Sequence, residues 1–113
     1  MAKWREITEL NEWETLWEKS GEKPVVVLKH STTCPVSANA LKEFESYLED
    51  QPNNEPEYVL VKVIESRPVS NRIAEDTGVK HESPQILWVK NKEQQWNTSH
   101  WAVTKAHMSA VLD

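Results

Sequence analysis

Apolar positions along the chain fall into segments that differ in their period. Residues 25–30 and 58–64 are almost continuous runs of aliphatic and β-branched side chains, a pattern typical of strands buried on both faces of a sheet. Residues 85–90 form a third such run, and residues 3–7 predict a short extended segment at the start of the chain. A hairpin turn then leads into a last strand at 94–97.

Helical periodicity separates these strands. The first predicted helix has Thr8 as its N-cap and carries apolar residues three and four positions apart: Leu10, Trp13, Leu16 and Trp17. The second starts at Pro35, and its inward positions are expected to be Ala38, Ala40, Leu41, Phe44, Tyr47 and Leu48. Shorter helices are predicted at 69–77, ended by Gly78, and at 104–112.

The predicted order of elements is β-α-β-α-β-α-β-β-α. Two βαβ crossovers followed by a hairpin and a helix give an α/β protein with a central mixed sheet flanked by helices on both faces. This is the order of the thioredoxin-like fold. A chain of 113 residues suits one domain, so a single thioredoxin-like domain is expected over residues 1–113.

Charge and hydropathy exclude several classes of function. The net charge is −5 and no run of Lys and Arg occurs, which argues against a nucleic-acid partner. The longest apolar run, residues 25–28, is far too short to span a membrane, and the N-terminus lacks the apolar core of a signal peptide. We therefore expect a cytoplasmic protein without a membrane partner, a setting that fits a chain with one cysteine.

The single cysteine, Cys34, lies between a predicted buried strand and a predicted helix. Pro35 suits the first helical position, where its missing N–H costs nothing, so Cys34 is the expected N-cap. A thiolate there is stabilised by the helix dipole and by hydrogen bonds from the N–H groups of residues 36–37. Lys29 and His30, at the end of the strand, are expected to add positive potential if their side chains point toward the site.

A lone cysteine is more often a small buried apolar side chain than a reactive one, and Cys-x-x-Ser alone is a weak signal. The preceding strand, Pro35 and a later Ser83–Pro84 pair together favour a reactive Cys34. Pro84 opens the strand at 85–90 and is a candidate for a cis peptide bond. In the thioredoxin fold, a cis-proline loop at this place in the topology faces the active-site cysteine.

Ser37 decides the class of mechanism. It stands three residues after Cys34, where a dithiol site has its second cysteine, and its hydroxyl cannot close a disulfide. Because the chain contains no other cysteine, Cys34 can form only an intermolecular mixed disulfide, which a thiol from outside must release. The Ser37 hydroxyl is also expected within reach of the Cys34 sulfur.

Two segments, KHSTTCPVSANA at 29–40 and VKHESPQ at 79–85, resemble the YtxJ-type bacillithiol-system proteins, the monothiol bacilliredoxins of low-GC Gram-positive bacteria. The resemblance extends over essentially the whole chain, including Trp96-Asn97 and His100. It implies a thioredoxin-like fold, a cytoplasmic setting and the removal of bacillithiol from S-bacillithiolated proteins. Bacillithiol is then a thiol co-substrate, and no tightly bound cofactor or metal is expected.

The resemblance also implies roles for individual residues. Cys34 is the nucleophile, Ser37 holds the place of a missing resolving cysteine, and Pro84 is the cis-proline. A second bacillithiol, or a flavoprotein disulfide reductase, would clear Cys34. The other residues of the two segments that are expected to contact substrate are the neighbours of Cys34 and Pro84: Thr33, Pro35, Val36 and Ser83. The backbone of Ser83 is expected to pair with the bound thiol.

The segment before the last helix departs from the glutathione-type glutaredoxins. Those proteins have a Gly-Gly-x-Asp-like turn that holds the tripeptide, whereas residues 98–104 here contain no glycine. A different low-molecular-weight thiol is therefore easier to accommodate, and Lys80, His81 and His100 are candidate partners for the malate carboxylates of bacillithiol. For each of the three, a solvated charge or an ordinary loop histidine is an equally good interpretation.

Two other classes of protein remain open at this point. One is a binding or adaptor module that keeps the fold without turnover, which an alkylation midpoint of Cys34 at or above that of a free cysteine, about pH 8.5, would favour. The other is an iron–sulfur carrier like some monothiol glutaredoxins, which an absorbance spectrum would reveal. Pro35 stiffens the turn, and the glutathione-type glycines are missing, so we rank the carrier last.

Overall fold

The computed structural model describes residues 4–50 and 53–112. Its strands are β1 (Trp4–Glu6), β2 (Val25–His30), β3 (Glu57–Lys62), β4 (Gln85–Lys90) and β5 (Glu93–Ser99). Its helices are α1 (Leu10–Glu18), α2 (Pro35–Glu49), α3 (Arg67–Thr77), the 3-10 helix η1 (His100–Ala102) and α4 (Lys105–Leu112). The predicted order of strands and helices is confirmed, with η1 inserted before the last helix. In the two described ranges, no helix is long and apolar enough to cross a membrane.

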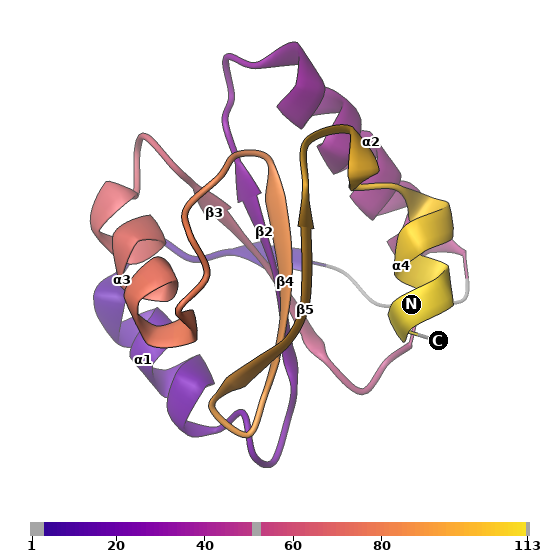
Figure 1. Cartoon of the computed structure of the whole chain (residues 1–113). Helices are drawn as coiled ribbons and strands as arrows, with labels where there is room; N and C mark the ends of the chain where they lie inside the picture. The colour runs from indigo at the N-terminus through magenta and orange to yellow at the C-terminus, as the bar shows by residue number, and fades with distance from the viewer. Residues whose placement is uncertain (1–3, 51–52, 113) are drawn as a thin grey trace.

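The five strands form one sheet in the order β1-β3-β2-β4-β5. Strands β1, β2 and β3 are parallel, whereas β4 is antiparallel to β2 and β5 is antiparallel to β4. Figure 1 shows α1 and α3 on one face of the sheet and α2 and α4 on the other. The predicted mixed sheet covered on both faces is confirmed, and β2 lies at its centre.

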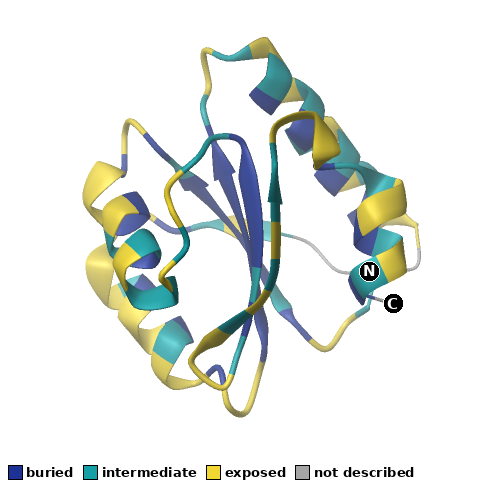
Figure 2. Cartoon of the chain, viewed as in Figure 1, coloured by how far each residue is buried: buried dark blue, intermediate teal, exposed yellow. Residues whose placement is uncertain are grey.

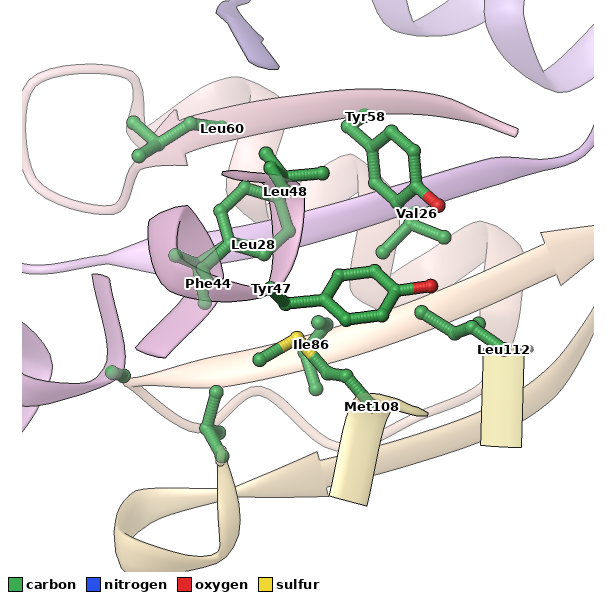
Figure 3. Packing of buried hydrophobic residues seen from close by; sticks show 12 residues of the cluster. Val26, Leu28, Phe44, Tyr47, Leu48, Tyr58, Leu60, Ile86, Met108 and Leu112 are labelled. Atoms are coloured by element: carbon green, nitrogen blue, oxygen red, sulfur yellow. The ribbon is translucent and has the colours of Figure 1, made fainter. Parts of the chain in front are cut away.

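Two cores form because successive side chains of a strand point to opposite faces of the sheet. Figure 3 shows the core beneath α2 and α4, which includes Val26, Leu28, Phe44, Tyr47, Met108 and Leu112. The core beneath α1 and α3 includes Val25, Val27, Trp13, Leu16 and Ile73. Strand β2 contributes to both cores, and this explains its apolar run at residues 25–28. Figure 2 shows the central strands as buried.

The first helix begins later than predicted. Its N-cap is Glu9, not Thr8. The backbone N–H groups of Thr8 and Glu9 both donate to Oε1 of Glu12, at 2.9 and 3.1 Å. These hydrogen bonds hold the pKa of Glu12 below its usual range. A carboxylate inside the first turn thus satisfies the free N–H groups, in the manner of a capping box, and the chain does not need the Thr8 hydroxyl for this purpose.

Two further details of the predicted pattern were wrong. Strand β3 ends at Lys62 rather than at residue 64, and the chain then turns and leaves Ile64 52% exposed. On α2, Ala38 is exposed, whereas Ser37 is fully buried against the sheet. The inward face of α2 therefore includes a polar residue, Ser37, which the periodicity of apolar residues does not mark.

The hairpin between β4 and β5 is tighter than predicted. Asn91 and Lys92 have positive φ angles of 55° and 57°, which is the backbone of a two-residue turn suited to the right-handed twist of the strands. The Lys92 N–H also donates to Ser20 Oγ at 2.9 Å. Strand β5 can therefore begin at Glu93 and extend to Ser99, beyond both ends of the predicted strand. Lys3, predicted in the first strand, lies outside the described residues.

Candidate functional site

Cys34 connects the central strand to the second helix. Figure 1 shows the junction of β2 and α2 at the top of the view, at the same edge as the start of β4. The Cys34 backbone is extended (φ −107°, ψ 123°) and its carbonyl accepts the Ala38 N–H at 3.0 Å, so Cys34 is the N-cap of α2, as predicted. Pro35 is the first helical residue. The thiol is free and partly exposed, so a sulfur from another molecule can approach it.

The predicted hydrogen bonds from the start of α2 to the Cys34 sulfur are not formed. Within the described residues, the Cys34 side chain makes no capping hydrogen bond. The chemical reason is that a neutral thiol is a weak acceptor, so it does not compete for backbone N–H groups as a hydroxyl or carboxylate does. Thr33 and Pro35 beside it are exposed, and Val36 is half-buried, and all three remain predicted contact residues.

Ser37 was expected to lie within reach of the Cys34 sulfur, and the contacts that its hydroxyl makes are with the strand end and the loop that precede Cys34. The Ser31 N–H donates to Ser37 Oγ at 2.8 Å, and the same oxygen lies 2.8 Å from Nδ1 of His30. Ser37 is fully buried. Its hydroxyl therefore ties the start of α2 to the loop that precedes Cys34.

His30 is a site residue that the sequence analysis did not assign a hydrogen-bonding role. It ends β2, its ring is buried, and burial lowers its pKa below the ordinary value for histidine. The signal in the sequence was a polar residue at the end of a continuously buried strand, directly before the loop that carries Cys34. Its partner, three residues into a helix, could not be read from that position alone.

The Ser83–Pro84 peptide bond is cis, as expected, and it belongs to a loop anchored from the side of β5. The carbonyl of Pro84 accepts the His100 N–H at 2.9 Å. Ser99 Oγ donates to a Glu82 carboxylate oxygen at 2.7 Å, and the ring of His100 lies 3.8 Å from the other oxygen of Glu82. The loop and the junction of β5 and η1 are therefore one connected wall of the site.

The same loop is also held by a contact with Lys29 of β2. This side chain is fully buried, and its Nζ lies 3.2 Å from Nδ1 of His81. Burial lowers the pKa of Lys29 to about 8, and burial together with the nearby Lys29 charge lowers the pKa of His81. Lys29 is the β2 neighbour of Gln85 in β4, and its side chain lies on the α3 side of the sheet, where Ser70 Oγ is 3.4 Å from His81 Nδ1.

Lys29 and His30 were expected to add positive potential at Cys34 if they point toward it, and Lys29 does not meet that condition. Consecutive residues of a strand point to opposite faces, so Lys29 points to the α3 side of the sheet, away from α2. His30 does face α2, but burial lowers the pKa of its ring and so disfavours the charged form. The positive end of the α2 dipole is left as the main favourable field at the sulfur.

The three residues expected to meet a low-molecular-weight thiol lie on the wall just described. Lys80 and His81 are exposed residues of the cis-proline loop, and His100 is exposed at the start of η1. His100 has a φ of 56°, so a histidine takes the left-handed backbone conformation that glycine adopts most easily. A glycine-free segment therefore still makes the tight turn. No group of three His, Cys, Asp or Glu side chains suited to a metal occurs among residues 4–50 and 53–112.

Comparison with known proteins agrees with this geometry. A family profile described as monothiol bacilliredoxin BrxC matches residues 5–108. A solved structure described as a candidate oxidoreductase with a thioredoxin fold is 34% identical, with 95% of this chain and 91% of that chain covered and a TM-score of 0.82.

More distant solved structures share the fold alone. The thioredoxin of Malassezia sympodialis, Mala s 13, is 17% identical, covers 96% of this chain and 89% of its own, and has a TM-score of 0.75. A thioredoxin of Schistosoma mansoni is 19% identical, with coverages of 97% and 93% and a TM-score of 0.75. The family match extends over most of the chain and includes both motif segments. This protein therefore belongs to the monothiol bacilliredoxin family and is a thiol oxidoreductase with the thioredoxin fold.

Proposed function

We propose that the protein removes bacillithiol from S-bacillithiolated cytoplasmic proteins through a mixed disulfide on Cys34. One observation carries the proposal. The only thiol of the chain is partly exposed at the start of α2, and the position three residues later holds a buried serine. Such a site can form a mixed disulfide with a thiol from another molecule, but it has no second sulfur in the chain that could release this disulfide.

The exchange takes place in two balanced steps. The Cys34 thiolate attacks the bacillithiol sulfur of the modified protein, a Cys34–bacillithiol disulfide forms, and the protein thiolate leaves. A second bacillithiol thiolate then attacks the bacillithiol sulfur of this adduct, which gives bacillithiol disulfide and restores the Cys34 thiolate. A flavoprotein disulfide reductase would return the bacillithiol disulfide to two thiols. Each exchange consumes one disulfide and forms another.

The wall formed by the cis-proline loop and η1 supports the proposal for substrate binding. Pro84 has no N–H, so the backbone of Ser83 is the part of the loop that can pair with a bound thiol in an extended conformation. Lys80 and His100 are exposed at this wall and can donate hydrogen bonds to malate carboxylates. The Nδ1 of His81 already meets Lys29, which leaves Nε2 of its ring for a ligand.

The proposal is tested by following the modification itself. A bacillithiolated protein is incubated with the wild type or with Cys34→Ala, and both partners are examined by intact mass spectrometry and peptide mapping. We expect loss of bacillithiol from the substrate with an equal gain on the Cys34 peptide. Absence of transfer by the wild type, or equal transfer by Cys34→Ala, would contradict the proposal and favour a binding module.

A further inference from the structure

The Ser37 hydroxyl has two hydrogen-bond partners, and its single proton can be arranged in one of two ways. The Ser31 N–H can only donate, so Ser37 Oγ is the acceptor of that 2.8 Å bond. The contact of 2.8 Å between Ser37 Oγ and His30 Nδ1 needs one proton between the two atoms. If Nδ1 is bare, the Ser37 hydroxyl donates to it. If Nδ1 carries the proton, His30 donates to Ser37 Oγ, and the Ser37 hydroxyl becomes free to donate to another acceptor.

Once it no longer donates to His30, the Ser37 hydroxyl can donate its hydrogen bond toward Cys34. Ser37 is the third residue of α2 and Cys34 is its N-cap, and side chains three positions apart on a helix are neighbours. Both lone pairs of Ser37 Oγ are then used, by the Ser31 N–H and by His30 Nδ1–H, so its O–H can only point elsewhere. A thiolate is a far better acceptor than a neutral thiol, and within the described residues the Cys34 side chain makes no capping hydrogen bond.

We propose that His30 is a positioning residue for the reaction: it donates Nδ1–H to Ser37 when Cys34 ionises, and Ser37 then donates its hydroxyl proton to the Cys34 thiolate. The inference rests on the proposed function only in taking Cys34 as the reacting thiol. The change needs no gain or loss of charge on His30. The Ser37 hydroxyl proton passes to Nδ1 of His30, the thiol proton of Cys34 passes to Ser37 Oγ, and one proton leaves Nε2 for water, so Cys34 becomes a thiolate and the ring remains neutral.

The surroundings of His30 favour a neutral ring that changes tautomer over a ring that becomes cationic. Burial lowers its pKa, and Lys62, its neighbour in β3, acts in the same direction. The hydrogen bond with Ser37 acts in the opposite direction, as do Glu65, after β3, and Glu45, on α2. His30 is 7% exposed as a residue, and the proposal requires that Nε2 is the part of the ring that water reaches.

The test follows the tautomer of His30 in the intact protein by NMR. The ¹⁵N shifts of the two ring nitrogens distinguish a protonated nitrogen from a bare one, and they are recorded across the ionisation of Cys34, which is monitored by the rate of alkylation on the same sample. We expect the proton to move from Nε2 to Nδ1 as the thiolate forms. In Cys34→Ser, which cannot form a thiolate, the tautomer should not change over that range of pH.

Ser37→Ala separates a relay through the hydroxyl from a direct effect of the thiolate charge. We expect the response of His30 to disappear in this variant, and the midpoint pH of Cys34 alkylation to rise by about one unit because a charge-assisted hydrogen bond is lost. A His30 ring that responds equally in Ser37→Ala, or that stays bare at Nδ1 in the wild type after Cys34 ionises, overturns the inference. None of these measurements uses bacillithiol, so their failure is distinct from a failure of the proposed function.

Discussion

The amine of Lys29 is buried beneath the cis-proline loop next to a histidine, and within the described residues no ion pair with a carboxylate involves it. The pKa of Lys29 is about 8 in the folded protein, compared with an ordinary value of 10.5. The unfolded chain therefore holds more protons between these two values, so the free energy of unfolding rises as the pH increases from about 8 to about 10.5. Below pH 8 the burial of this charge costs roughly 3 kcal/mol.

Replacement of this amine is expected to stabilise the protein. Lys29→Met keeps the aliphatic stem and removes the charge, so the free energy of unfolding should rise by roughly 1–3 kcal/mol at pH 7. The advantage over the wild type should shrink between pH 8 and pH 10. Urea denaturation at pH 7 and pH 10 checks this, with Lys80→Met, an exposed lysine of the same loop, as the control. A less stable Lys29→Met at pH 7 would mean that the amine makes a net favourable contact with His81.

At the scale of elements, two ends of helices decide the local structure. Helix α1 is started by the carboxylate of Glu12, and helix α2 by Cys34 and Pro35. The second start was predictable because a proline after a buried strand marks it in the sequence. The first was not, because Thr8 and Glu9 both lie where an N-cap could be, and only the position of the Glu12 carboxylate decides between them.

The start of α1 gives a prediction about stability. Glu12→Ala should lower the free energy of unfolding by about 1 kcal/mol at pH 7, because two backbone N–H groups lose their acceptor. The pKa of Glu12 is lowered in the folded state, so its contribution is present above the ordinary pKa of 4.5 and is lost as the pH falls through the folded value. Denaturation experiments should show a larger difference between Glu12→Ala and the wild type at pH 7 than at pH 3. Glu75→Ala, at an exposed position of α3, should change little at either pH.

The cis-proline loop gives a prediction about activity. Ser99→Ala removes the 2.7 Å hydrogen bond to Glu82, which joins this loop to the end of β5. We expect the rate of bacillithiol transfer to fall by about three- to tenfold, because a less fixed loop positions the substrate less well. The rate of Cys34 alkylation by iodoacetamide should not change, since that reagent does not need the loop. Equal losses in both reactions would show that Ser99 affects the thiol itself.

At the scale of the whole molecule, the sheet brings together residues that the sequence keeps apart. The order of elements and the buried central strand were predictable, because burial on both faces leaves a continuous apolar run. Cys34, Pro35 and Pro84 were also predictable, since each stands in a short motif.

The contacts behind these residues were not predictable. His30 contacts Ser37 from the other end of the loop that carries Cys34. Lys29, in β2, contacts His81, in the loop before the neighbouring strand β4. Neither pair has a spacing that identifies it in the sequence, and only the register of the sheet and the start of α2 place them. The residues of the two motifs were therefore easier to predict from the sequence than the buried contacts that hold them in place.

The central claim is that Cys34 can accept a thiol group but cannot pass it on alone. A single-turnover experiment with equal amounts of wild-type protein and bacillithiolated substrate, without free thiol, tests it most directly by intact mass. We predict one bacillithiol on Cys34 that persists until free bacillithiol is added, whereas Ser37→Cys should clear its adduct unaided by closing a disulfide with Cys34. A wild-type adduct that disappears without added thiol, or that never forms on Cys34, would contradict the account.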